Sequence, residues 1–347
     1  MGVPIKEVVN VRQSGNPNEL AKIESVVPSA DRTASCKSGN QGQAETAETV
    51  RVLLHDLIDY AGLFPPASLA MSPSVANYET YLHSEWSWIL GRFIVPAARL
   101  GECETAFKLL PPPPPQSALL PLKMSVILGD DLVAGAELLR VWGDRLAKSS
   151  TARSAMIESV EVRVDNSDSV VRAVQTIPVG MTIYFEAPTA RWTECAAAAA
   201  GSGHRMKIRM GGETADKFPT SESVVAFLGL CATHRLPFKA TAGLHHPLRS
   251  VHRLTYQPDS PSGMMHGFLN LFLAAAFLRA GLEPQLALQL LDERSIEALH
   301  FDSDGVTWRK EYLPRAELLL TRHEYSISFG SCSFTEPIDD LRSLGLL

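Results

Sequence analysis

Four short segments decide the fold of this chain: SVEVRV (159–164), MTIYFEA (181–187), RMKIRM (205–210) and PFKATA (237–242). In each of them apolar residues alternate with polar ones, which is the period of a β-strand. The residues between the segments favour helices, at 167–176, 191–200 and 221–234. Strands that alternate with helices of this length indicate βαβ units and a parallel sheet.

The alternation extends to both sides of these segments. Earlier strands are predicted at 92–97 and 123–128, and a last one at 326–330, which makes seven. An eighth strand is either residues 58–64 or one arm of a hairpin at 297–309. We therefore predict an α/β fold with a (β/α)8 barrel, which typically spans about 250 residues. An open doubly wound parallel sheet is the alternative, but the chain has no GxGxxG or GxxxxGK[ST] motif to support nucleotide binding.

Composition places the barrel in one domain, residues 47–347. Residues 1–46 are rich in Ser, Asn, Gln and Gly without sustained periodicity, and we predict a disordered tail there. The net charge of -6 gives no basic patch for nucleic acid. The five cysteines form no CxxC pair, so neither a disulfide framework nor a zinc site is indicated.

The sequence also predicts the cellular location of the protein. It begins without a charged start followed by an apolar run, and its most apolar segment, 264–280, is short for a membrane span of about 20 residues. We expect a cytoplasmic protein that has no membrane partner. The same apolar segment would supply a homodimer surface if it were exposed.

Charged side chains share one face of the predicted strands. Parallel strands are normally covered on both faces, so in a barrel the charged face points inward. Buried charges pair, bind a ligand or take part in chemistry. Because barrel sites lie at the carboxyl ends of the strands, Arg205 and Lys207 are expected deep in the barrel. The residues expected nearest the substrate are Arg163, Asp165, Glu186, Arg209, Lys239 and Thr241. A purely structural ion-pair network that also includes Glu161 is the alternative.

Lys239 is the leading catalytic candidate. A lysine in a dry pocket beside other cations has a lowered pKa and can attack a carbonyl to form a Schiff base. The KATAG stretch (239–243) resembles the lysine strand of class I, deoxyribose-phosphate-aldolase-like barrels, where a similar run ends the sixth strand. The resemblance implies that Lys239 is the Schiff-base lysine. The alternative is that Lys239 anchors Glu186 or a substrate carboxylate.

Other residues complete the expected site. Small-residue loops present backbone N–H groups to an anion, and we expect this of Gly211, Gly212, Gly330 and Ser331, with Arg163, Arg209 and Thr241 as further substrate-binding residues. His245 is a candidate acid or base beside Glu186. Cys332 is expected to be a small buried hydrophobe, with a nucleophilic thiol as the alternative. Glu336 is a candidate for proton transfer or a lid.

The function that these residues predict is an enzyme acting on a small anionic carbonyl compound, such as a sugar phosphate or a keto acid. An aldolase or lyase reaction through Lys239 is favoured, and neither a cofactor nor a metal is expected. One alternative is a metal-dependent hydrolase or isomerase that uses Glu186, His245 and His266. The other is a barrel that binds a ligand without catalysis.

Overall fold

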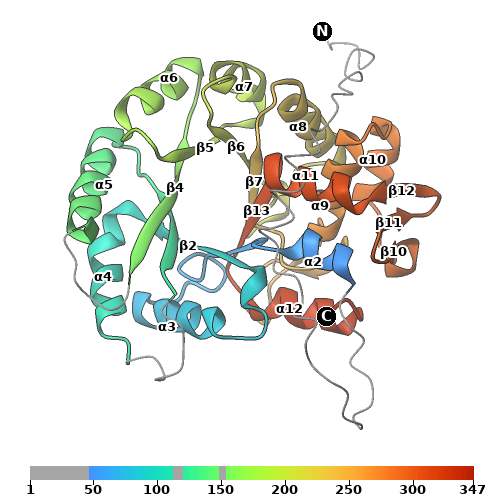
Figure 1. Ribbon diagram of the computed structural model, residues 1–347, viewed down its shortest axis with the longest axis horizontal. Coiled ribbons are helices and arrows are strands. Elements are labelled where there is room, and N and C mark those ends of the chain that lie inside the picture. Colours follow the sequence, from blue (N-terminus) through green and yellow to red (C-terminus); the bar gives the residue numbers. More distant parts are fainter. Residues whose placement is uncertain (1–46, 112–119, 148–153) are drawn as a thin grey trace.

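The centre of the molecule is a closed barrel of eight parallel strands (Figure 1). The computed structural model describes residues 47–111, 120–147 and 154–347, so the predicted tail, 1–46, lies outside the described residues. In order around the barrel the strands are β1 (Ile58–Tyr60), β2 (Leu90–Pro96), β3 (Leu122–Ile127), β4 (Ala155–Arg163), β5 (Thr182–Glu186), β6 (Arg205–Arg209), β7 (Phe238–Thr241) and β13 (Ser326–Ser331). Each neighbouring pair is parallel. The predicted (β/α)8 barrel is confirmed.

Helices surround the barrel on its outside (Figure 1). Two of them begin at polar caps: the Asn166 side chain accepts a hydrogen bond from Ser169 N, and Thr220 does the same from Ser223 N. Every helix within the described ranges is too short or too polar to cross a membrane. The helices are α2 (Glu48–Leu54), α3 (Met71–Leu82), α4 (Leu100–Lys108), α5 (Leu132–Ala147), α6 (Ser167–Thr176), α7 (Trp192–Ala199), α8 (Ser221–Thr233), α9 (Phe268–Arg279), α10 (Pro284–Leu291), α11 (Arg315–Glu324) and α12 (Thr335–Ser343).

The eighth barrel strand is β1, the first of the two options that the sequence left open. The hairpin region instead forms a separate antiparallel sheet of β10 (Leu299–Phe301), β11 (Gly305–Trp308) and β12 (Glu311–Pro314). After β7 the chain also forms a small antiparallel pair, β8 (Ser250–Arg253) and β9 (Ser262–Met265). These strands have four residues each, too few for a clear alternation.

The apolar segment 264–280 does not supply a dimer surface. Most of it is α9, in which every residue from Phe268 to Phe277 is buried within this chain. The helix packs between α8, α10, α11 and β13. An apolar helix that is hydrophobic all round is typical of such a core position. The formation of a homodimer stays a prediction, and the apolar segment 264–280 is not the surface that would form it.

The two faces of the barrel strands differ in polarity. On β4, Val160 and Val162 are buried with the core residues under the helices. Glu161, between them in sequence, contacts Lys239 of β7, a strand that is not its neighbour in the barrel. Such a contact requires both side chains to cross the barrel interior. The expected inward direction of the charged face is confirmed.

Candidate active site

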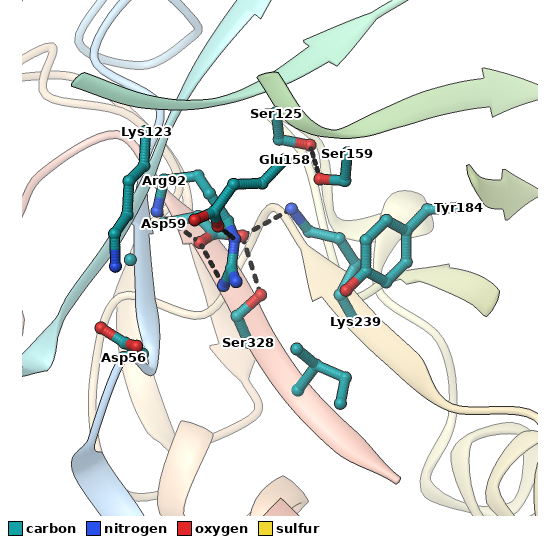
Figure 2. A network of polar contacts seen from close by, with 12 residues as sticks. Asp56, Asp59, Arg92, Lys123, Ser125, Glu158, Ser159, Tyr184, Lys239 and Ser328 are labelled. Carbon is teal, nitrogen blue, oxygen red and sulfur yellow. Dashed lines mark hydrogen bonds and ion pairs between the residues drawn. The ribbon is translucent and has the colours of Figure 1, made fainter. Parts of the chain in front are cut away.

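Lys239 lies inside the barrel between two carboxylates. Its Nζ is 2.6 Å from Oδ2 of Asp59 on β1 and 2.8 Å from Oε1 of Glu161 on β4. Figure 2 shows Lys239 pointing toward Asp59, which also accepts a hydrogen bond of 2.8 Å from Ser328 on β13. The Lys239 side chain is only 1% exposed. Burial alone would lower the pKa of Lys239, but Asp59 and Glu161 outweigh it and raise that pKa above its ordinary value.

This arrangement corrects two expectations about Lys239. The prediction that neighbouring cations lower its pKa is wrong, because Asp59 and Glu161 contact Lys239 directly and Glu161 lies between it and Lys207. Its strand is also the seventh of the barrel and not the sixth, because β1 precedes the strands that the pattern showed clearly. The sixth strand carries Lys207, which is the direct register partner of Lys239.

Lys207 continues the set of ion pairs away from Lys239. Its Nζ lies 2.7 Å from Oε2 of Glu161 and 2.6 Å from Oε2 of Glu186. Arg209 then donates from Nε to Oε1 of Glu186 over 3.1 Å. We call the resulting alternating series the charge chain: Asp59, Lys239, Glu161, Lys207, Glu186 and Arg209.

The two central carboxylates of the charge chain are held ionised. Burial alone would raise the pKa of Glu161, but Lys207 and Lys239 outweigh it and lower that pKa well below its usual range. The pKa of Glu186 is lowered in the same way by Lys207 and Arg209. Ser125 adds a hydrogen bond of 2.7 Å to Oε1 of Glu161. With three carboxylates and three cations, the charge chain is neutral as a whole.

A second set of contacts closes the interior toward the amino ends of the strands. Arg92 on β2 donates from its backbone N to Oδ1 of Asp59 over 2.8 Å and from Nε to Glu158 over 2.8 Å (Figure 2). On the opposite wall, Arg205 donates to the hydroxyl of Tyr184 over 2.7 Å. Glu158, Tyr184 and Arg205 precede the charge-chain residues on β4, β5 and β6, so the expected deep position of Arg205 agrees with the structure.

A pocket of about 480 Å³ opens at the carboxyl ends of β4, β5 and β6. It contains residues of both charges beside aromatic and proline walls. Glu186 and Arg209 belong both to the pocket and to the charge chain, so the two meet there. The lining residues are Arg163, Val164, Asp165, Glu186, Ala187, Pro188, Thr189, Trp192, Arg209, Asp216, Lys217, Phe218 and Pro219.

The predicted substrate-binding residues divide into two groups. Arg163 and Arg209 line the pocket. Gly211, Gly212, Thr241, Gly330 and Ser331 follow or end neighbouring strands but do not line it. At Gly211 an added Cβ would come 2.8 Å from the Cα of Gly243, so close packing of two loops explains this glycine without an anion. Anion binding by these loops stays a prediction.

The histidines lie apart from Glu186. Nδ1 of His245 is 3.2 Å from Glu336 on α12, and Nδ1 of His266 is 3.0 Å from an Arg249 nitrogen. Glu186 is occupied by Lys207 and Arg209. Among the residues that the structure describes, no three His, Cys, Asp or Glu side chains are grouped to hold a metal. The geometry therefore gives no support to the hydrolase alternative that joined Glu186, His245 and His266.

Comparison with protein-family models, curated proteins and solved structures gave no match for this chain. The resemblance of the KATAG stretch to aldolase-like barrels therefore stays an expectation from five residues.

Sequence reasoning gave too little weight to three residues of the charge chain. Asp59 lies on a strand of only three residues, where no alternation is visible. Glu161 and Lys207 were correctly placed on the inner face. Because barrel sites lie at the carboxyl ends of strands, we expected the later residues Arg163 and Arg209 to be nearer the substrate than these two. The signal for both was a second charged residue two positions before the strand end on the same face: the acid Glu161 before Arg163, and the base Lys207 before Arg209.

Proposed function

We propose that this barrel is an enzyme that acts on a small anionic carbonyl compound, a sugar phosphate or a keto acid, through a Schiff base on an interior lysine. The charge chain is the observation that carries the proposal. It links a pocket at the carboxyl ends of the strands, where barrel enzymes bind substrate, to two buried lysines. Aldolase or lyase chemistry is the reaction class that such a lysine serves.

The roles of the pocket residues follow from their charges. Arg163 and Arg209 supply planar cations that suit a phosphate or carboxylate. A ligand anion on Arg209 competes with Glu186 for the same guanidinium. Glu186 released in this way is a carboxylate at the pocket wall, available to move protons during the reaction.

Two lysines compete for the role of the nucleophile. Lys239 is the candidate from the sequence, but its two carboxylate partners lie outside the pocket. Lys207 contacts Glu186, which lines the pocket, and it is therefore one contact nearer to a bound ligand. The ammonium must first lose a proton, and for Lys207 the acceptor is Glu186, once a ligand anion on Arg209 has released that carboxylate. The free amine then adds to the carbonyl carbon, and loss of water from the adduct leaves an iminium ion.

Reductive trapping tests this proposal. The protein is incubated with sodium borohydride and either pyruvate or glyceraldehyde 3-phosphate, and modified peptides are located by mass spectrometry. We expect an adduct on Lys207 or Lys239 that disappears in the corresponding lysine-to-methionine variant. Lys108→Met, at an exposed lysine paired with Glu104, is the matched control and should leave trapping unchanged.

The outcomes separate the competing functions. An adduct on either interior lysine supports the proposal and identifies the nucleophile. Saturable binding of both compounds with no adduct on either lysine would instead identify a barrel that binds ligands without Schiff-base chemistry.

A further inference from the structure

A cysteine and a histidine meet on the carboxyl-end face of the barrel, outside the charge chain and its pocket. Cys332 directly follows β13, and His245 follows β7. The Sγ of Cys332 is 3.9 Å from Nδ1 of His245, and the same Nδ1 is 3.2 Å from Oε2 of Glu336. The hydroxyl of Tyr256, from the turn between β8 and β9, lies 3.5 Å from Sγ and 3.2 Å from Oε2 of Glu336. We call these four residues the thiol cluster.

The local backbone brings His245 to this position. Ala242 and Gly243 have φ angles of 59° and 69°, so the chain reverses immediately after β7. A non-glycine residue such as Ala242 in this region is uncommon and carries a cost in conformational energy. The reversal directs the chain toward the end of β13, where Cys332 lies.

The charges of the thiol cluster suit a thiolate. Burial alone would lower the pKa of His245, but hydrogen bonds to Cys332 and Glu336 outweigh it and raise that pKa to about 9. The imidazole is therefore protonated at neutral pH, and a protonated histidine stabilises a neighbouring thiolate. Burial and the contacts with Cys332 and Glu336 raise the pKa of Tyr256, so its hydroxyl keeps its proton and remains a donor.

All four described cysteines are buried, but they differ in their position. Cys103, Cys195 and Cys231 lie on the helices α4, α7 and α8, whereas Cys332 follows a barrel strand. Burial raises the pKa of Cys103 to about 12 and of Cys195 to about 11, and it raises the pKa of Cys231 further. These three thiols are suited to packing, and they serve as internal controls for reactivity.

We propose that Cys332 is a nucleophilic thiol, paired with His245 and oriented by Glu336, that adds reversibly to the carbonyl of a small uncharged aldehyde. In this step the sulfur forms a bond to the carbonyl carbon, and the π electron pair moves to the oxygen. That oxygen takes the proton held by His245, while the hydroxyl of Tyr256 is placed to donate a hydrogen bond to it. The product is a thiohemiacetal, and the step needs neither a leaving group nor an oxidant.

The surroundings of Cys332 set the size and charge of this ligand. The residue is only 5% exposed, and the partly exposed side chain of Tyr256 lies over its sulfur. A short aldehyde fits such a restricted approach. The carboxylate of Glu336 contacts the same imidazole nitrogen and the same hydroxyl as the sulfur, and its charge disfavours an anionic ligand.

The first test is the pH dependence of alkylation by iodoacetamide, followed at each cysteine peptide by mass spectrometry. An ordinary thiol has a pKa of about 8.5, so its thiolate fraction rises by about 80-fold between pH 6 and 8. The proposed pairing with His245 predicts a rate at Cys332 that changes by less than about threefold over this range, because a cysteine that gives its proton to a histidine reacts as part of a thiolate–imidazolium pair. A rate at Cys332 that rises like that of N-acetylcysteine would overturn the proposal without the use of any variant.

Variants assign this behaviour to the partners of Cys332. His245→Asn should restore the steep pH profile, and Glu336→Gln should shift the point at which the pair loses its proton to lower pH. His323→Asn, at an exposed histidine on α11, is the matched control and should keep the flat profile. Two further histidines adjoin the thiol cluster: Nδ1 of His246 lies 2.6 Å from Asp340, and the ring of His252 stacks on His246. His252→Asn checks that this stacked pair does not set the pH profile of Cys332.

The aldehyde is tested separately. Acetaldehyde should slow alkylation of Cys332 at least tenfold more than it slows alkylation of N-acetylcysteine, and washing should reverse the effect. Slowing that is equal for the two thiols refutes aldehyde binding. Because Cys332 takes no part in the charge chain, this result is independent of whether borohydride traps Lys207 or Lys239.

Discussion

The carboxylate of Glu161 is the central element of the charge chain, and replacing it tests the electrostatic account of the barrel. Glu161 is 2% exposed, contacts both lysines at 2.8 and 2.7 Å and accepts a hydrogen bond from Ser125. Glu161→Gln keeps the shape of the side chain but leaves two positive lysines with one negative partner fewer. Removing one partner of a buried ion pair costs about 3–5 kcal/mol. We expect a loss of this size in the free energy of unfolding.

Urea unfolding followed by tryptophan fluorescence and circular dichroism measures this loss. The slope of the free energy of unfolding against urea concentration should be the same for the variants. Glu102→Gln is the matched control, because Glu102 forms an ion pair with Arg99 at 2.8 Å but is 51% exposed. Exposed pairs of this kind contribute about 0.2–1 kcal/mol. If Glu161→Gln lowers the free energy of unfolding by less than about 1 kcal/mol, as expected for the control, then Glu161 does not stabilise the two lysines and the reasoning is refuted.

The pH dependence gives an independent measure of the same interaction. The pKa of Glu161 in the folded protein lies below its value in the unfolded chain, which is about 4.3 for glutamate. Its stabilising contribution is therefore present above about pH 4.3 and is lost as the pH falls further. In Glu161→Gln this part of the acid sensitivity disappears. Some sensitivity remains, because the pKa of Glu186 is lowered as well.

Three further predictions concern single positions. Arg209→Met should raise the Kd of a phosphate- or carboxylate-bearing ligand by about ten- to a hundredfold, since a charged hydrogen bond contributes about 1.5–3 kcal/mol; calorimetric titration measures it. Gly243→Ala should destabilise the fold by about 1–3 kcal/mol, because φ is 69° and the added Cβ would lie 2.7 Å from the Cα of Gly211. Gly229→Ala in α8 is the control: its added Cβ would meet nothing within 4 Å, so this substitution should be neutral or stabilising. Asn166→Ala should cost about 1 kcal/mol in urea unfolding, because it removes the hydrogen bond that caps α6.

The fold was predictable because its signal is local. Alternation of apolar and polar residues on β4 to β7 shows both the strands and their inner face, and helical segments between them imply parallel pairing. The first strand was harder, because Ile58–Tyr60 is fully buried and has three residues, too few to show a period. Its identity follows from closure of the barrel, which is a property of the whole chain.

The site was predictable only in part. The pattern placed Glu186, Arg163 and Arg209 at strand ends, and they line the pocket. It could not show which acid faces which base across the barrel, because Lys239 meets Asp59 from the far end of the sequence. The sign of the pKa shift of Lys239 depends on that pairing. Counting the cations on neighbouring strands therefore gave the wrong direction.

The charged interior itself argues for a functional barrel. A buried ion pair rarely stabilises a protein more than well-packed apolar side chains of the same volume, because desolvation offsets the attraction. An apolar interior of leucine and valine would fill this barrel without that cost, as it does in many barrels. Stability therefore does not account for three carboxylates and three cations in one row. Because the row is neutral and ends at a pocket, a ligand anion that took the place of Glu186 on Arg209 would change the charge around Lys207 first, and then around Glu161 and Lys239.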